Sequence, residues 1–208
     1  MDREEHPLLV EELCRVGRLL GRGGLVVADD GNLSARAPDG TIWITPRGVR
    51  KDALKPEDLV RIGLDGHRLQ DPAPPSSEYQ LHLEIYRRRV DVGAIVHAHP
   101  PIATGFAAAR QPIPDDVLAE AALALGPVPV VPYREPGTAE VGEAVAPILG
   151  SCQAFLLANH GAVAMGRDPE DACRRMERLE HVARTLLTAR LLGGAHPLTR
   201  DQREAFDS

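Results

Sequence analysis

Residues 92–99 read Val92-Gly93-Ala94-Ile95-Val96-His97-Ala98-His99, an apolar run that ends in two histidines one residue apart. A short apolar run of this kind predicts a buried strand. Alternate residues of a strand point to the same side, so both imidazoles can reach one metal ion. A single His-x-His pair also arises by chance, and either ring could be hydrogen-bonded in a core. The surrounding sequence therefore has to discriminate between these interpretations.

A third histidine follows a second apolar run. Ala154-Phe155-Leu156-Leu157 leads into Ala158-Asn159-His160-Gly161, so His160 also lies at the end of a predicted strand. Three imidazoles that converge from two strand ends leave one coordination position open, which is typical of catalytic rather than structural zinc sites. The pattern predicts His97, His99 and His160 as ligands of zinc, with manganese or cobalt as alternative ions.

Glu78 is the predicted companion of the three histidines. It lies at the start of a helix predicted over residues 77–89, where Ser77 and Gln80 have capping-box spacing, and this helix leads into the histidine strand. A carboxylate there can be a metal ligand or a general base. By itself, a glutamate at a helix start is as well explained by the helix dipole. His82, one turn later, is expected to pack or to form hydrogen bonds, and service as a fourth ligand is the less favoured option.

The remaining sequence alternates helical and strand-like patterns around one predicted sheet. Helices are expected at residues 7–22, 101–109, 115–125, 139–149 and 169–192. Strands are expected at residues 31–36, 41–45, 58–62, 93–97, 128–131, 153–157 and 161–165. This alternation predicts a single α/β domain of three α/β/α layers over residues 1–208, with its core at about 8–193 and a polar tail at 199–208.

Composition narrows the possible partners. The 208 residues are 43% hydrophobic without a long apolar stretch, which favours one domain, no membrane span and a cytoplasmic location. The formal net charge of −6 and the lack of a basic run interleaved with aromatics argue against nucleic acid. Cys14, Cys152 and Cys173 lack C-x-x-C spacing and are expected to be small core residues in a reducing compartment.

The two lysines bear on mechanism. Lys51 and Lys55 are the only lysines of the chain, and both lie in a segment that is interpreted as a polar surface turn. Schiff-base chemistry needs a lysine that is desolvated in an apolar pocket. Covalent amine catalysis is therefore disfavoured.

Three segments could contact an anion: Gly31-Asn32, Arg47-Gly48 and Ser76-Ser77. Glycine allows close backbone approach, serine and asparagine donate hydrogen bonds, and a helix start offers free N–H groups. Each segment alone is also typical of an ordinary turn. Together with a metal site, they predict a place for a small phosphorylated substrate.

An ordered set of motifs resembles the class II aldolase and adducin head-domain family, whose best-known members include fuculose-1-phosphate aldolases. The resemblance covers about residues 8–193 and implies that family's central mixed, largely antiparallel sheet. The motifs that carry it are Gly31-Asn32-Leu33-Ser34, Ile44-Thr45-Pro46-Arg47-Gly48, Ser76-Ser77-Glu78, residues 89–99, residues 133–138 and Asn159-His160-Gly161.

The resemblance implies a set of roles. It makes His97, His99 and His160 zinc ligands, and Glu78 an acid/base residue that yields its metal contact to the substrate. The reaction implied is cleavage of a ketose 1-phosphate to dihydroxyacetone phosphate and an aldehyde through a metal-stabilised enediolate. Cyclic homotetramers with active sites between subunits are implied as well. The positions that match phosphate-binding residues of the family are Gly31, Asn32, Gly48, Ser76 and Ser77, and Arg47 stands where threonine or serine is usual.

One departure keeps other reactions open. Leu118 matches the position of a tyrosine that, in the fuculose enzymes, donates a proton to the substrate aldehyde from a neighbouring subunit. The same metal site could instead serve a decarboxylase of a 3-oxo sugar-acid phosphate or a dehydratase of a thioribulose phosphate. A non-catalytic adducin-like interaction module is disfavoured, because all three histidines and Glu78 are present.

Overall fold

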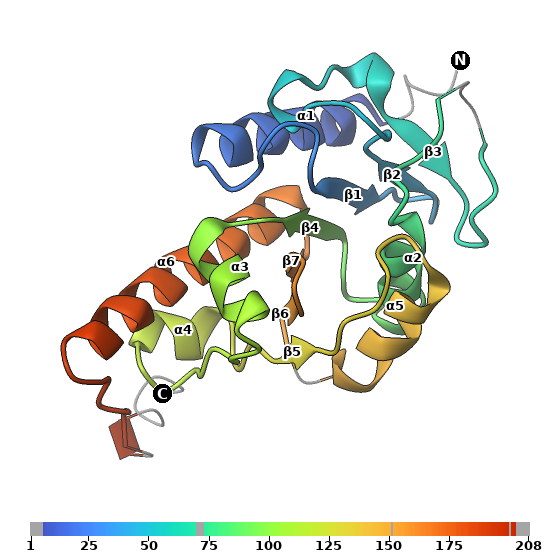
Figure 1. Ribbon diagram of the computed structural model, residues 1–208. Helices are drawn as coiled ribbons and strands as arrows, with labels where there is room; N and C mark the ends of the chain where they lie inside the picture. The colour runs from blue at the N-terminus through green and yellow to red at the C-terminus, as the bar shows by residue number, and fades with distance from the viewer. Residues whose placement is uncertain (1–5, 70–72, 151, 200, 203–208) are drawn as a thin grey trace.

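The computed structural model describes residues 6–69, 73–150, 152–199 and 201–202. A seven-stranded sheet in the order β3-β2-β1-β4-β7-β6-β5 forms its centre (Figure 1). All neighbouring strands are antiparallel except β5 and β6, which are parallel. The strands are β1 (Asn32–Arg36), β2 (Ile42–Ile44), β3 (Val60–Ile62), β4 (Ala94–Ala98), β5 (Val130–Val131), β6 (Ala154–Leu157) and β7 (Gly161–Gly166).

Helices cover both faces of the sheet, which confirms the predicted three layers (Figure 1). One face packs against α1 (Pro7–Arg22), α3 (Pro101–Ala108), α4 (Ala119–Ala124) and α6 (Pro169–Leu191). The other face packs against α2 (Tyr79–Arg88) and α5 (Ala139–Val145). None of the helices in the described residues is long and apolar enough to span a membrane.

Alternation along β4 places the first histidine. Val96 and Ala98 pack in the core cluster of the α6 face, whereas Ile95 packs in the cluster of the α2 face. His97 therefore points toward the α2 face, between the neighbouring strands β1 and β7. His99 follows the end of β4, where its backbone N–H donates to the carbonyl of Leu25 at 3.0 Å.

Most predicted elements are confirmed to within two residues at their ends. The helix predicted over 115–125 is shorter, because α4 begins only at Ala119. The second half of the helix predicted over 139–149 continues as a 3₁₀ turn, Ala146–Ile148, which contains Pro147. The predicted tail at 199–208 lies largely outside the described residues.

The predicted capping box of α2 is wrong. The N-cap residue is Glu78 rather than Ser77, and no side chain caps the helix. Instead, the hydroxyl of Ser76 accepts a hydrogen bond from the backbone N–H of Glu78 at 3.3 Å. The cap position is thus held by a residue whose side chain turns toward the histidines.

Candidate metal centre

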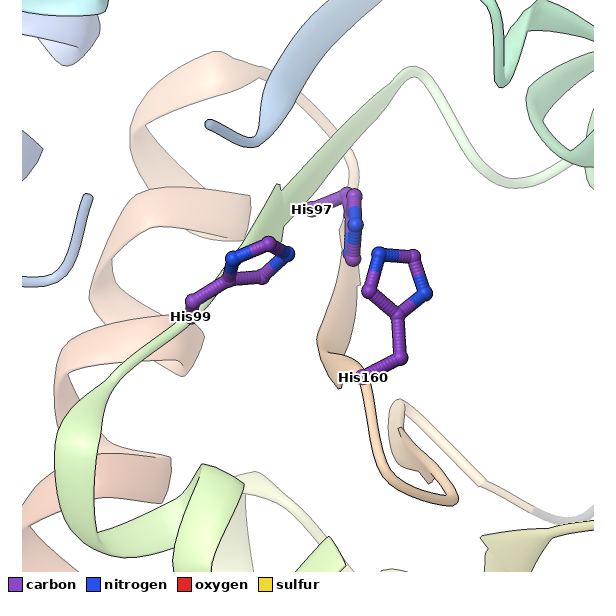
Figure 2. Close-up of side chains that lie close together, drawn as sticks. All are labelled: His97, His99 and His160. Atoms are coloured by element: carbon purple, nitrogen blue, oxygen red, sulfur yellow. The ribbon is translucent and has the colours of Figure 1, made fainter. Parts of the chain in front are cut away.

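Three histidines from two segments of the chain lie together at the end of β4 (Figure 2). The centroids of their rings are 4.8–5.1 Å apart, and one ligand nitrogen from each lies within 4.8 Å of the others. His97 belongs to β4, His99 follows it, and His160 lies in the turn between β6 and β7. The sequence-predicted cluster of His97, His99 and His160 is brought together.

Unsatisfied polar atoms face the centre of this cluster. The Nδ1 atom of His97 lies 2.9 Å from the carbonyl of Ala162 and donates to it, which leaves Nε2 directed at the other rings. The Nε2 atoms of His97 and His99 and the Oε1 atom of Glu78 are buried without a hydrogen bond of good geometry. Buried polar groups normally have partners, so these three atoms fit a divalent metal ion that they would coordinate.

Two glycines allow the histidine segments to approach one another. A Cβ on Gly161 would clash with the ring of His99 and would lie 2.7 Å from the carbonyl of Ala98. Gly31 has φ +73°, and a Cβ there would lie 2.6 Å from the carbonyl of His97. Larger residues at either position would push the backbone away from the cluster.

Glu78 reaches the cluster from the N-terminus of α2. Its Oε2 lies 3.1 Å from Nε2 of His97, and its Oε1 lies 3.7 Å from Nε2 of His160. Burial raises the pKa of Glu78, but the charge and hydrogen bond of His97, together with His160 and Asn32, outweigh burial and hold that pKa well below its ordinary value. The side chain is therefore a carboxylate at neutral pH, the form that can bind a metal or accept a proton.

The imidazoles are mostly held neutral, as metal ligands must be. Burial, reinforced by the charge of His97, lowers the pKa of His160 to about 4 and also lowers the pKa of His99. Burial opposes protonation of His97 as well, but the adjacent Glu78 carboxylate outweighs it and raises the pKa of His97. A metal cation at the cluster would take the place of that proton beside Glu78.

A cavity of about 260 Å³ opens beside the cluster. Its wall includes Glu78, His99 and His160 together with all six residues of the three predicted anion-contacting segments, Gly31, Asn32, Arg47, Gly48, Ser76 and Ser77. Backbone bonds from Arg47 to Pro74 and from Ser76 to Thr45 hold two of these segments side by side. The candidate anion pocket and the candidate metal centre are thus continuous.

Two features of the cavity were not anticipated from the sequence. Lys51 is not a surface residue: it is 1% exposed, and its ammonium donates to the carbonyls of Asp29 and Val49 at 2.6 Å each. It joins the loop before β1 to the loop after β2 and also lines the cavity. Asp30 lines the cavity too, with Oδ2 3.6 Å from Nδ1 of His99, and its place directly before Gly31 was the available signal.

Comparison with known protein families shows to which family this chain belongs. Residues 11–187 match the family described as "Class II Aldolase and Adducin N-terminal domain". This chain belongs to the class II aldolase family.

Relatives of this chain include enzymes that are named for different substrates and reactions. It is 33% identical to the 3-oxo-tetronate 4-phosphate decarboxylase of Escherichia coli K12, over 86% of this chain and 85% of the relative. It is 37% identical to the 5-methylthioribulose-1-phosphate/5-deoxyribulose-1-phosphate aldolase of Rhodospirillum rubrum, over 77% of this chain and 72% of the relative. A solved L-fuculose 1-phosphate aldolase superposes with a TM-score of 0.89 at 31% identity, covering 95% of this chain and 93% of that one. The protein is accordingly an enzyme of the aldolase type.

Leu118, the residue at the position where the family resemblance leads one to expect a tyrosine, lies away from the cavity. Leu118 is the N-cap residue of α4 and packs, partly buried, against the core of the α6 face. It does not line the cavity beside the histidines. The structure thus places Leu118 against the core of the α6 face and not beside the three histidines of the same chain.

Proposed function

We propose that this protein is a metal-dependent lyase that breaks a carbon–carbon bond of a small phosphorylated sugar. The observation that carries the proposal is the continuity between the three-histidine cluster with Glu78 and the cavity lined by the anion-contacting segments. A phosphate in the cavity would orient the rest of the substrate toward Glu78 and the imidazoles.

We assign the metal to His97, His99 and His160, with Glu78 as a further ligand until substrate arrives, and zinc as the first candidate ion. When bound, the ion supplies positive charge that stabilises the enediolate left as the bond breaks. Nitrogen ligands suit zinc, while manganese and cobalt are the alternatives.

Glu78 moves the proton in this proposal. During aldol cleavage its carboxylate accepts the proton of the substrate C4 hydroxyl while the C3–C4 bond breaks and the aldehyde forms. The same proton is then returned to C3, which gives dihydroxyacetone phosphate. The carboxylate form at neutral pH and its place between His97 and the cavity support this role.

Aldol cleavage of a ketose 1-phosphate is the first candidate reaction. The similarity to an L-fuculose 1-phosphate aldolase and to a 5-deoxyribulose-1-phosphate aldolase supports it. Leu118 favours a second candidate, the decarboxylation of a 3-oxo sugar-acid phosphate. Loss of CO₂ requires no proton donor at the leaving group, and a decarboxylase is among the relatives.

A substrate panel distinguishes the two reactions. The purified protein is assayed with ketose 1-phosphates and with 3-oxo-acid phosphates for release of triose phosphate and of CO₂, with and without a chelator. We expect turnover of one class that is lost with chelator and restored by Zn²⁺. Chelator-insensitive turnover would refute a metal-dependent mechanism.

We propose in addition the homotetramer that the family resemblance implies, with active sites between subunits. In such an assembly a residue of the neighbouring subunit other than Leu118 would supply the proton donor. Analytical ultracentrifugation tests this proposal, and a monomer that retains full turnover contradicts it.

A further inference from the structure

A chain of buried side chains continues from Glu78 into the protein. The Oε2 atom of Glu78 accepts a hydrogen bond from Nδ2 of Asn32 at 2.9 Å, and Oδ1 of Asn32 lies 2.5 Å from Nε2 of His82. The other ring nitrogen of His82, Nδ1, lies 2.6 Å from the hydroxyl of Ser34, which lies 2.8 Å from the hydroxyl of Tyr86. All five residues are at most 8% exposed.

The spacing of polar residues along α2 matches their spacing along β1, which allows this series of hydrogen bonds. Glu78, His82 and Tyr86 follow one another at four-residue spacing along one side of α2, while Asn32 and Ser34 are alternate residues of β1. Four helical residues advance by about 6 Å and two strand residues by about 6.6 Å, so the two rows stay in step. Each polar residue of the helix consequently meets one of the strand.

The donors in this chain can run in one direction only. The Glu78 carboxylate only accepts, so Asn32 must present its NH₂ group to it and its carbonyl to His82. His82 must then donate from Nε2, because the Asn32 carbonyl cannot donate. Burial, reinforced by the charge of His97, lowers the pKa of His82 to about 3, so the ring is neutral and Nδ1 accepts from Ser34. Ser34 in turn accepts from Tyr86.

We propose that His82 is a positioning residue that acts through Asn32 to hold the Glu78 carboxylate in its working orientation. The inference rests on the proposed role of Glu78. If the donor from His82 is lost, the Asn32 amide is free to rotate and to direct its carbonyl oxygen at Oε2 of Glu78. Two acceptors then face each other, and the carboxylate must leave its position beside His97.

Tyr86, the last residue in this series of hydrogen-bonded side chains, is held in place by contacts of its own. The Arg36 guanidinium donates to the carbonyl of Tyr86 at 2.6 Å and lies over the Tyr86 ring at 4.9 Å from its centroid. Tyr86 is 1% exposed and packs in the core of the α2 face. The rigid core therefore fixes the hydroxyl of Ser34, which supports the tautomer of His82 that the Asn32 carbonyl requires.

Two substitutions at His82 separate positioning from packing. In His82→Gln the amide nitrogen can take the place of Nε2 and still donate to Asn32. In His82→Asn the shorter amide can accept from Ser34 at the Nδ1 position but does not reach Asn32. Both variants lose the imidazole ring and the packing that it provides. The smaller asparagine loses more of that packing, and urea unfolding measures the resulting loss of stability separately from metal binding.

The test titrates wild type and both variants with Co²⁺ alone and records affinity and the visible absorption spectrum. We expect His82→Asn to weaken Co²⁺ binding on the order of tenfold and to change the spectrum, as is usual for groups that orient metal ligands. His82→Gln should retain the wild-type spectrum and bind within about threefold of wild type. Equal behaviour of the two variants overturns the inference.

A second variant covers the case in which His82→Asn does not fold. Ser34→Ala removes the donor to Nδ1, so the tautomer of His82 then depends on the Asn32 carbonyl alone. We expect the ¹⁵N shifts of the His82 ring and the Co²⁺ spectrum either both to stay as in wild type or both to change. A change in only one of the two contradicts the inference.

The outcomes keep this inference separate from the proposed function. Wild-type protein that does not bind Co²⁺ refutes the metal centre, and the positioning role falls with it. Wild-type protein that binds Co²⁺ and is active, with all variants indistinguishable from it, refutes the positioning role alone.

Discussion

Glu78 is the single side chain on which the proposed chemistry depends. Glu78→Gln keeps the shape of the residue but removes the carboxylate that accepts the proton. We expect turnover to fall by about 100-fold or more, in the range usual for a lost general base, while the metal content stays stoichiometric. Metal analysis and steady-state kinetics on the same preparation check this. Undiminished turnover excludes the role of Glu78.

Gly161 offers a second test at the residue scale. In Gly161→Ala the new methyl group meets the His99 ring and the carbonyl of Ala98. We expect the free energy of unfolding to drop by about 1–3 kcal/mol and the metal affinity to weaken, because His99 must move. Urea unfolding and Co²⁺ titration measure the two effects.

Gly105→Ala is the matched control for that substitution. Gly105 lies within α3, and a Cβ there has open space around it. Alanine in a helix interior is more favourable than glycine by about 0.5–1 kcal/mol, so this variant should gain stability and keep its metal affinity. The assignment fails if the two variants affect Co²⁺ binding alike.

At the scale of elements, the strands and helices were predictable from local patterns of apolar residues. Buried positions recur every second residue in a strand and about every 3.6 residues in a helix, so each type of element leaves its own pattern in the sequence. The same alternation, with the strand ends, brought His97, His99 and His160 into one prediction. The predictions that were wrong concern residues whose environment is formed by segments distant in the sequence. The polar surroundings of Lys51 in the sequence indicated a surface turn, but its ammonium donates to the carbonyl of Asp29, in the loop before β1, and to that of nearby Val49.

The role of Asn32 shows the same limit. The sequence predicted it as an anion contact, and it does line the cavity. Its side-chain amide, however, is engaged between Glu78 and His82. That pairing depends on the register of α2 against β1, which residues nearly fifty positions apart determine. No local pattern in either segment contains this information.

The N-terminus of α3 is capped by a side chain from another helix, and this contact can be tested by mutation. The buried carboxylate of Glu180, on α6, accepts hydrogen bonds from the backbone N–H groups of Ile102 at 3.1 Å and Ala103 at 2.9 Å. These N–H groups have no acceptor within their own helix. We expect Glu180→Ala to lower the free energy of unfolding by about 1.5–3 kcal/mol, as measured by urea denaturation.

Glu180→Gln provides the control for α3. Its carbonyl oxygen can still accept from one of the two N–H groups, so it should cost less than Glu180→Ala. Because α3 begins two residues after His99, the alanine variant should also weaken Co²⁺ binding more than the glutamine variant. A glutamine variant that is as unstable as the alanine variant would contradict capping by the carboxylate.

At the scale of the whole molecule, the buried site sits within the packing between β1, β4 and α2, so its protonation is linked to unfolding. His82 has a folded-state pKa of about 3 against 6.5 for an ordinary histidine. Below pH 6.5 the unfolded chain binds a proton at this residue that the folded chain does not. Stability must therefore fall as the pH is lowered from 6.5 toward 3. The depressed pKa of His160, also buried, acts in the same direction.

His82→Gln isolates this contribution because it removes the titrating ring and keeps the donor to Asn32. We expect metal-free wild type to lose stability between pH 6.5 and 4.5 more steeply than the variant, by up to about 1.4 kcal/mol per pH unit, the value for one proton. Urea unfolding at several pH values with chelator present measures both slopes. Glu78 loses stabilising interactions with acid in both proteins, so its effect cancels in the difference. Parallel slopes would mean that the folded protein accommodates a protonated His82, and the directional hydrogen-bond chain from Glu78 to Tyr86 could not then persist at low pH.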